Sequence, residues 1–137
     1  FDRILLDAPC SGTGTLSRHP EIRWRLRPEQ LAEFHALQSQ MLRTALARLA
    51  PGGRLVYSTC SIEPEENEDV VAQALREPPA FAASIRRVPA SDAAQLLAPH
   101  LAPGVNAAAL FDSSGFFRTS PPVHHTDGFF AALLEKP

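Results

Sequence analysis

Residues 54–76 read RLVYSTCSIEPEENEDVVAQALR, and they join a strand pattern, a polar loop and a helical pattern. The run RLVYS at 54–58 is rich in residues that favour strands, and it ends at TCS, residues 59–61. We expect a helix to open at Pro64, because proline suits the first helical turn and acidic residues beside it favour the helix dipole. Its apolar stripe has helical spacing and comprises Val70, Val71, Ala74 and Leu75. A strand followed by a helix in this way is a building block of α/β sheets.

The same order occurs at the beginning of the sequence. FDRILL, residues 1–6, is a short apolar run that we interpret as a buried strand, and Asp7 and a loop follow it. A long helix is expected from Pro28 to the sequence PGG at 51–53, which ends it. Its apolar positions recur at helical spacing and are Leu31, Phe34, Leu37, Met41, Leu42, Ala45, Leu46 and Leu49.

The C-terminal part adds further strand patterns. GFFAALLE at 128–135 reads as a buried strand, and residues 116–119 are expected to pair with it. Residues 84–88 are a candidate strand, whereas the Ala- and Pro-rich residues 89–115 carry no assignable pattern. Strand, helix, strand, helix, strand is the order of a doubly wound, Rossmann-like α/β sheet, and 137 residues suffice for one domain.

Two cysteines follow the first two predicted strands. In doubly wound sheets, ligands bind outside the carboxyl ends of the strands, so Cys10 and Cys60 meet at one crevice if these strands are neighbours. A cysteine just before a helix is a candidate nucleophile, because the positive end of the helix favours the thiolate. The acidic turn after Cys60 opposes this effect in part. The alternative is that both cysteines are small buried apolar residues.

Composition excludes several classes of protein. The net charge of −2 argues against a wholly basic nucleic-acid binder but leaves room for a local basic patch. No apolar run reaches the length of a membrane span, and no basic leader of a secretory signal is visible, so we expect no membrane partner. Two cysteines make neither a disulfide framework nor a zinc motif, and a reduced, cytoplasmic setting is the expectation.

One dense basic segment, residues 18–27, contains Arg18, His19, Arg23, Arg25 and Arg27 around Trp24. Cations for phosphates and a ring for stacking are what a looped or single-stranded RNA requires. The alternatives are a solvated loop with Trp24 in the core, and an arginine excess caused by a GC-rich genome. His124 and His125 do not indicate a metal site, since adjacent residues on a strand point to opposite faces.

Two long motifs each contain one cysteine: DAPCSGTG at 7–14 and STCSIEPEENE at 58–68. Four shorter motifs accompany them: RHPEIRW at 18–24, RLVY at 54–57, Arg118-x-x-Pro121 and TDGFF at 126–130. Together they resemble motifs of the NOP/Sun family of RNA cytosine-5 methyltransferases, and the resemblance covers residues 1 to about 75 and 116 to 136. It implies the C-terminal half of a class I methyltransferase sheet.

The resemblance also implies roles for individual residues. Cys60 would attack carbon 6 of cytosine, and Cys10 would assist release of the enzyme after methyl transfer from S-adenosyl-L-methionine. Asp7 would face the polar edge of the base and, with Pro9, lie beside the cofactor; a loop aspartate bonded to its own backbone is the alternative. Arg18, His19, Arg23, Arg25 and Arg118 would contact the RNA, expected to be rRNA or tRNA, and the intact enzyme would be a monomer.

The glycine loop and the acids that hold the cofactor in this family lie upstream of the first motif, and residues 1–137 contain none of them. We therefore expect a partial catalytic domain that lacks its N-terminal, cofactor-binding half and is inactive alone. Three alternatives stay open. A DNA cytosine-5 methyltransferase would use Cys10 as nucleophile, an amino-group methyltransferase would need an aromatic residue after Pro9, and a non-catalytic RNA-binding remnant would need neither thiol.

Overall fold

A computed structural model of the protein describes residues 1–76 and 85–137. Five strands form one sheet in the order β1-β2-β5-β3, and β4 also pairs with β5. The strands are β1 (Arg3–Asp7), β2 (Arg54–Thr59), β3 (Arg86–Arg87), β4 (Phe117–Thr119) and β5 (Phe129–Glu135). β1 and β2 are parallel neighbours, whereas β5 runs antiparallel to β2, β3 and β4. The α/β class, the adjacency of the first two strands and the pairing of β4 with β5 are thus confirmed.

Alternate residues of β2 and β5 form one buried face of the sheet. The pleat brings the buried side chains of the two strands into register as Leu55 with Leu134, Tyr57 with Ala132, and Thr59 with Phe130. The Tyr57 and Phe130 rings meet edge to face, with their centroids 6.3 Å apart. The side chains of this face form the sheet side of the hydrophobic core.

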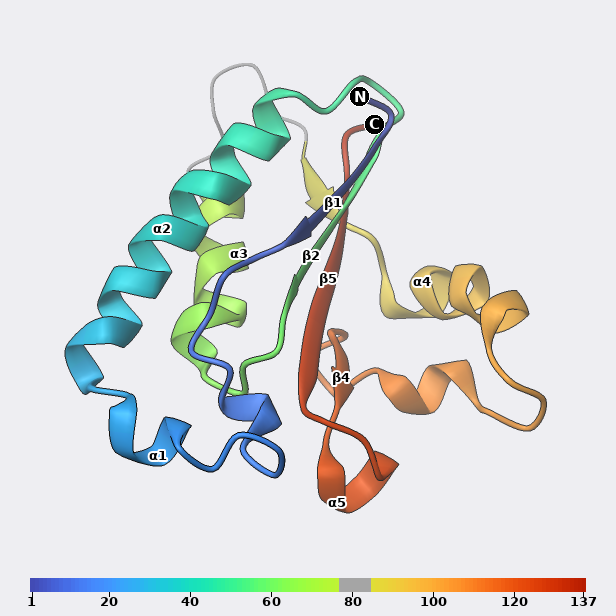
Figure 1. Ribbon diagram of the computed structural model, residues 1–137. Helices are drawn as coiled ribbons and strands as arrows, with labels where there is room; N and C mark the ends of the chain where they lie inside the picture. The colour runs from blue at the N-terminus through green and yellow to red at the C-terminus, as the bar shows by residue number, and fades with distance from the viewer. Residues whose placement is uncertain (77–84) are drawn as a thin grey trace.

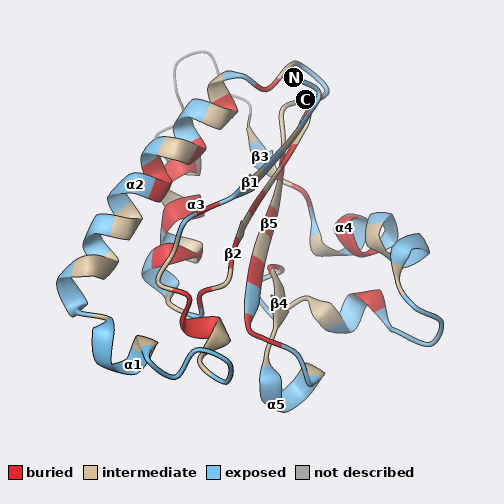
Figure 2. Cartoon of the chain, viewed as in Figure 1, coloured by how far each residue is buried: buried red, intermediate tan, exposed pale blue. Residues whose placement is uncertain are grey.

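Two helices cover that face, α2 (Pro28–Ala47) and α3 (Glu68–Arg76), as Figure 1 shows. Leu42 and Leu46 of α2 and Val70 of α3 are completely buried against the sheet. The buried positions of both helices lie on their inner sides (Figure 2). Each such aliphatic side chain contributes about 1.5–3 kcal/mol relative to an exposed position.

The other side of the sheet carries α4 (Ala90–Leu97) and the 3₁₀ helices η4 (Ala98–His100) and η5 (Ala107–Leu110) (Figure 1). These elements fall in the region where the sequence carried no assignable pattern. The short elements η1 (Thr13–Thr15), α1 (Ile22–Arg25) and α5 (Pro121–His124) lie at the end of the sheet where β1 and β2 finish. Among the described residues, no helix has both the length and the apolar character that crossing a bilayer requires.

The expected start of the second helix at Pro64 was wrong. Pro64–Glu66 form a separate 3₁₀ turn, η2, and the backbone of Asn67 leaves helical geometry before α3 begins. The Asn67 side chain bonds to the end of β2 and the loop after it. Its Oδ1 accepts from Thr59 Oγ1 at 2.5 Å, and its Nδ2 donates to the Ser61 carbonyl at 2.9 Å. Of the candidate strand at 84–88, Arg86 and Arg87 form β3, and residue 84 lies outside the described residues.

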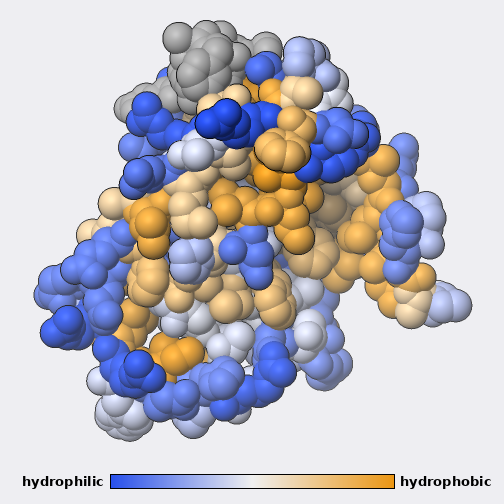
Figure 3. Space-filling model, turned by 45° about the horizontal axis from the view of Figure 1, so that its top comes forward, coloured by the Kyte–Doolittle hydropathy of each residue, from blue (hydrophilic) through white to orange (hydrophobic). Residues whose placement is uncertain are grey.

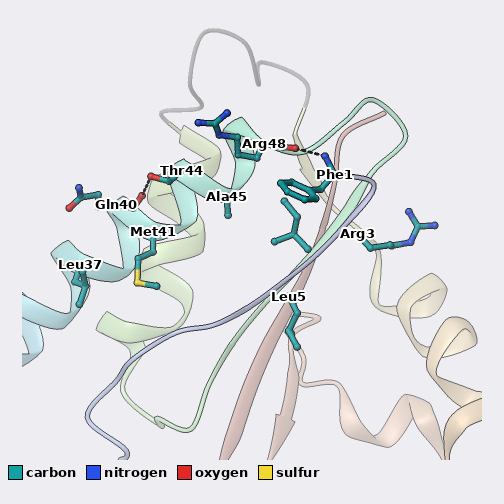
Figure 4. Close-up of a pocket in the computed structure, with 10 residues that line it drawn as sticks. Phe1, Arg3, Leu5, Leu37, Gln40, Met41, Thr44, Ala45 and Arg48 are labelled. Atoms are coloured by element: carbon teal, nitrogen blue, oxygen red, sulfur yellow. Dashed lines mark hydrogen bonds between the residues drawn. The ribbon is translucent and has the colours of Figure 1, made fainter.

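The outer edge of β1 has no partner strand within the described residues. Phe1 and Leu5 are 78% and 72% exposed there, and a cavity of about 610 Å³ separates this edge from α2. Figure 4 shows Leu37 and Met41 on the α2 side of this cavity and Phe1 and Leu5 on the strand side. In the space-filling view, apolar residues gather on the surface in this region (Figure 3).

Candidate active site

The two cysteines meet at the carboxyl ends of β1 and β2. Cys10 follows β1 by a short turn and Cys60 follows directly after the last residue of β2. Their sulfur atoms are 3.4 Å apart, both thiols are free, and both residues are half-buried. Parallel pairing of the strands produces this contact, because it brings Asp7 opposite Ser58 at the same end of the sheet. The predicted convergence of the two thiols is therefore confirmed.

The surroundings of the Cys10 thiol keep it protonated. Burial, followed by the hydrogen bond and the charge of Cys60, raises the pKa of Cys10 to about 12. Cys10 therefore keeps its proton at neutral pH and can donate it to the sulfur of Cys60. The pair thus places a protonated Cys10 thiol directly against the sulfur of Cys60.

A buried carboxylate lies beneath both cysteine loops. Glu66, at the end of η2, is fully buried, and its Oε1 accepts from the Ser11 backbone N–H at 2.8 Å and from Gln38 Nε2 at 3.1 Å. Its Oε2 accepts from Ser61 Oγ at 2.5 Å and from the Ser11 hydroxyl. We call Glu66, Ser11, Ser61 and Gln38 the Glu66 cluster. It joins the residue after each cysteine to a single side chain.

Two glycines, Gly14 and Gly128, allow the segment before β5 to pack closely against the cysteine loops. The Gly14 N–H donates to the Cys60 carbonyl at 2.9 Å, and the Gly128 N–H donates to the Gly14 carbonyl at 2.8 Å. A Cβ on Gly14 would lie 2.0 Å from the Gly128 oxygen, which no side chain tolerates. Backbone contact thus joins the first cysteine loop, the second cysteine loop and the segment before β5.

Comparison with known proteins shows the family to which the chain belongs. Residues 1–135 match the family model described as 16S rRNA methyltransferase RsmB/F. The chain belongs to the RsmB/F methyltransferase family. It is 45% identical over 136 residues to ribosomal RNA small subunit methyltransferase B of Klebsiella pneumoniae, and the match covers 99% of this chain and 26% of that protein.

Solved structures give the same result. The crystal structure of PH0851 aligns over 98% of this chain and 26% of its own, with 39% identity and a TM-score of 0.77. NSun6 from Pyrococcus horikoshii, solved with SFG, aligns over 96% of this chain and 29% of its own, with 28% identity and a TM-score of 0.66. These neighbours support the Rossmann-like methyltransferase sheet. The chain spans about a quarter of the length of the curated RsmB/F relative.

Asp7 and Pro9, the residues expected beside base and cofactor, lie at the exposed rim of this RsmB/F-type site. Asp7 ends β1, and its Oδ1 accepts from Ser58 Oγ at 3.1 Å. Pro9 is exposed, and its carbonyl accepts from Gln38 Nε2 at 2.9 Å. Both residues are thus exposed next to Cys10 in the loop after β1.

The basic segment is placed next to the first cysteine loop. A cavity of about 230 Å³ lies between Ser11 on that loop and Arg25, Ile22 and Phe34. Trp24 is 87% exposed, so the alternative that packed it into the core was wrong. Arg23 and Arg25 are exposed beside it.

The remaining predicted RNA contacts have partners within the protein. Arg18 pairs with Asp127, and His19 Nδ1 lies 3.3 Å from Glu21 Oε1. Arg118 is held between Glu68 and Asp112, with 2.6 Å to the latter, and its guanidinium lies 5.1 Å from the centroid of the Phe130 ring. An RNA contact by Arg118 stays a prediction, and its observed contacts join β4 to α3.

Sequence reasoning missed the residues that support the cysteines. Glu66 is one of several acids beside Pro64, and nothing in the sequence distinguishes it from its exposed neighbour Glu65. Gln38 and Ser39 occupy buried positions of α2. Their place among the regularly spaced apolar residues of that helix was the signal in the sequence that could have indicated buried polar contacts. Gln38 Nε2 donates both to the Pro9 carbonyl and to Glu66.

Proposed function

We propose that the intact protein methylates carbon 5 of a cytosine in ribosomal RNA through a covalent adduct at Cys60. The observation that carries this proposal is the 3.4 Å contact, at adjacent strand ends, between the sulfur of Cys60 and that of Cys10, whose pKa is raised. Carbon 5 of cytosine is a weak nucleophile until a thiolate adds to carbon 6, which divides one difficult step into two easier ones. The name of the family, 16S rRNA methyltransferase, supports rRNA as the substrate.

In the first step the Cys60 sulfur forms a bond to carbon 6, and the electrons of the 5,6 double bond become available at carbon 5. Asp7, exposed at the end of β1, would face the ring nitrogen and amino group of the base, accept a hydrogen bond from the amino group and stabilise the proton that the ring nitrogen takes up as the thiolate adds. S-adenosylmethionine, when bound, supplies the methyl group. Release requires that carbon 5 lose its proton, that the double bond form again and that the bond from carbon 6 to Cys60 break.

The pKa of Cys10 suits it to this later step. Two causes of its raised pKa are the hydrogen bond to Cys60 and the charge of Cys60. Once Cys60 is bonded to the base, its sulfur is neutral, so both causes disappear and the pKa of Cys10 falls. Cys10 then gives up its proton to solvent more readily than before, and its thiolate accepts the proton of carbon 5. The same reasoning disfavours Cys10 as the first nucleophile.

S-adenosylmethionine is supported as the cofactor by the family and by the neighbour solved with SFG, an analogue of it. The described residues fit one side of such a site, because Asp7 and Pro9 are exposed at the rim beside the free edge of β1. Residues 1–137 contain no glycine-rich cofactor loop. We therefore propose that most of the cofactor pocket comes from another part of the protein. Two free thiols suit a reduced compartment such as the cytoplasm.

The cysteine roles are tested by one denaturing gel with the intact enzyme and its RNA. Cys60→Ala should abolish both methylation and the covalent complex. Cys10→Ala should stop turnover by trapping the enzyme on methylated RNA, and that complex should vanish in the double variant. If Cys60→Ala accumulates the complex and Cys10→Ala does not, the roles are reversed. Cys10 is then the nucleophile, as the DNA cytosine-5 methyltransferase alternative requires. If neither variant changes methylation, both thiols are structural.

A further inference from the structure

Glu66 contacts the two cysteine loops at equivalent positions. Ser11 follows Cys10 and Ser61 follows Cys60, and both serines donate to the Glu66 carboxylate. All four hydrogen bonds to the carboxylate come from residues of the Glu66 cluster. An ionised carboxylate has about four acceptor positions. The geometry therefore provides a donor for each of them.

The Glu66 cluster also fixes the other side of the Cys10 loop. Gln38 Nε2 donates both to Glu66 and to the Pro9 carbonyl. Of the two neighbours of Cys10, Pro9 is thus bonded to Gln38 and Ser11 to Glu66, and these two side chains are bonded to each other. The backbone of Glu66 is fixed in turn, because its carbonyl accepts from the Tyr57 hydroxyl at 2.6 Å. Burial of a carboxylate is costly unless its hydrogen bonds are complete, so this arrangement tolerates little displacement of either loop.

We propose that Glu66 is a positioning residue that sets the separation of the Cys10 and Cys60 thiols by holding the residue that follows each of them. The consequence for catalysis rests on the proposed function. Carbons 5 and 6 of cytosine are bonded to each other, so two thiols that act on them in turn must both lie within reach of adjacent atoms. A shift of either loop would leave one step intact and slow the other.

The spacing of the thiols can be measured without RNA or cofactor. Phenylarsine oxide condenses with two neighbouring thiols, forming two As–S bonds and releasing one water, and mass spectrometry of proteolytic peptides locates the product. In the intact enzyme, Glu66→Ala should weaken capture by the Cys10–Cys60 pair by about 10- to 100-fold, the factor expected from removing one or two hydrogen bonds to a charged group. Glu66→Gln should stay close to wild type, because its amide can donate to the two serine hydroxyls while its oxygen keeps the other two donors.

Glu65→Ala is the matched control, since Glu65 lies in the same turn with its side chain exposed. If Glu66→Ala fails to fold by circular dichroism, the Ser11→Ala/Ser61→Ala double variant removes the hydroxyl donors and should weaken capture in the same direction. On RNA, Glu66→Ala should lower kcat with little change in KM, and Glu66→Gln should restore most of the rate. A structural role alone would not link the rate to the capture of the two thiols.

The inference and the proposed function fail in different ways. If folded Glu66→Ala and the serine double variant both capture the arsenical as wild type does, the positioning role is wrong. If capture falls as expected but the wild-type enzyme forms no covalent complex with RNA, the positioning role stands and the proposed chemistry is wrong.

Discussion

At the scale of single residues, the proposed chemistry depends on how the Cys10 thiol responds to the state of Cys60. Burial is the largest cause of the raised pKa of Cys10, and it persists whatever the state of Cys60. The hydrogen bond and the charge of Cys60 add to it and are removed when Cys60 reacts. This response of Cys10 favours the proposed order, in which Cys60 reacts first.

This coupling predicts how Cys10 reacts with an alkylating reagent. Only the thiolate reacts, so Cys10 should be alkylated slowly near pH 8, far below its pKa of about 12. Cys60→Ala removes two causes of the raised pKa, so the pKa of Cys10 should fall, although burial still acts to raise it. The alkylation rate of Cys10 at fixed pH should therefore rise, by about tenfold for each unit that the pKa falls. The rate is measured against pH with iodoacetamide and mass spectrometry, and an unchanged profile would show that the thiols are independent.

At the scale of elements, the sequence predicted what local periodicity determines. β1, β2 and α2 were found where apolar spacing and the proline and glycine signals placed them. The break at Asn67 was not predictable in this way, because it depends on a hydrogen bond to Thr59 across the loop. The internal pairing of Arg118 was missed for a similar reason, since one partner, Glu68, lies 50 residues earlier.

The residues of the candidate site also differ in whether local sequence predicts them. Both cysteines were placed correctly because each follows a strand that the pattern itself predicts. Glu66 was not recognised, because its burial is decided by donors on α2 and on the loop after β1. Elements and their ends can thus be inferred locally, whereas the groups that support a reactive side chain come from several elements.

The basic segment around α1 gives a prediction at this scale, made for the intact enzyme. Arg23→Ala/Arg25→Ala should weaken RNA binding and flatten its dependence on salt, by about 0.7 in the logarithmic slope for each single-strand phosphate that is no longer neutralised. Trp24→Ala should lower affinity by about 1–3 kcal/mol while leaving the slope unchanged, because stacking releases no counterions. Arg43→Ala, exposed on α2, is the control for removal of a single positive charge. If Arg23→Ala/Arg25→Ala leaves the slope unchanged, the segment is an ordinary solvated loop.

At the scale of the whole molecule, the sheet is covered unevenly. α2 and α3 pack on one face, but the outer edge of β1 is unpaired within the described residues and carries exposed Phe1 and Leu5 (Figure 1). An apolar strand edge of this kind is a template for pairing with another strand. The free edge lies beside Asp7 and Pro9, where one side of the proposed cofactor site is placed.

Residues 1–137 produced alone should therefore bind S-adenosylmethionine poorly. They contain no glycine-rich loop, and the cofactor would meet Asp7 and Pro9 on one side and water on the other. We expect affinity at least about 100-fold below that of the intact enzyme, a factor that corresponds to roughly 3 kcal/mol of binding free energy. Calorimetry on both proteins measures it.

The same unpaired edge should make the isolated chain self-associate. A variant that blocks this association is therefore the control for the measurement of cofactor binding. Leu5→Lys places a charge on the exposed edge and should reduce association without improving cofactor binding, since it blocks strand pairing but adds no pocket. Sedimentation of both samples separates the two effects. Micromolar binding of S-adenosylmethionine to a monomeric Leu5→Lys chain would show that these residues hold the cofactor by themselves, and the proposal that most of the pocket lies elsewhere in the protein would then be wrong.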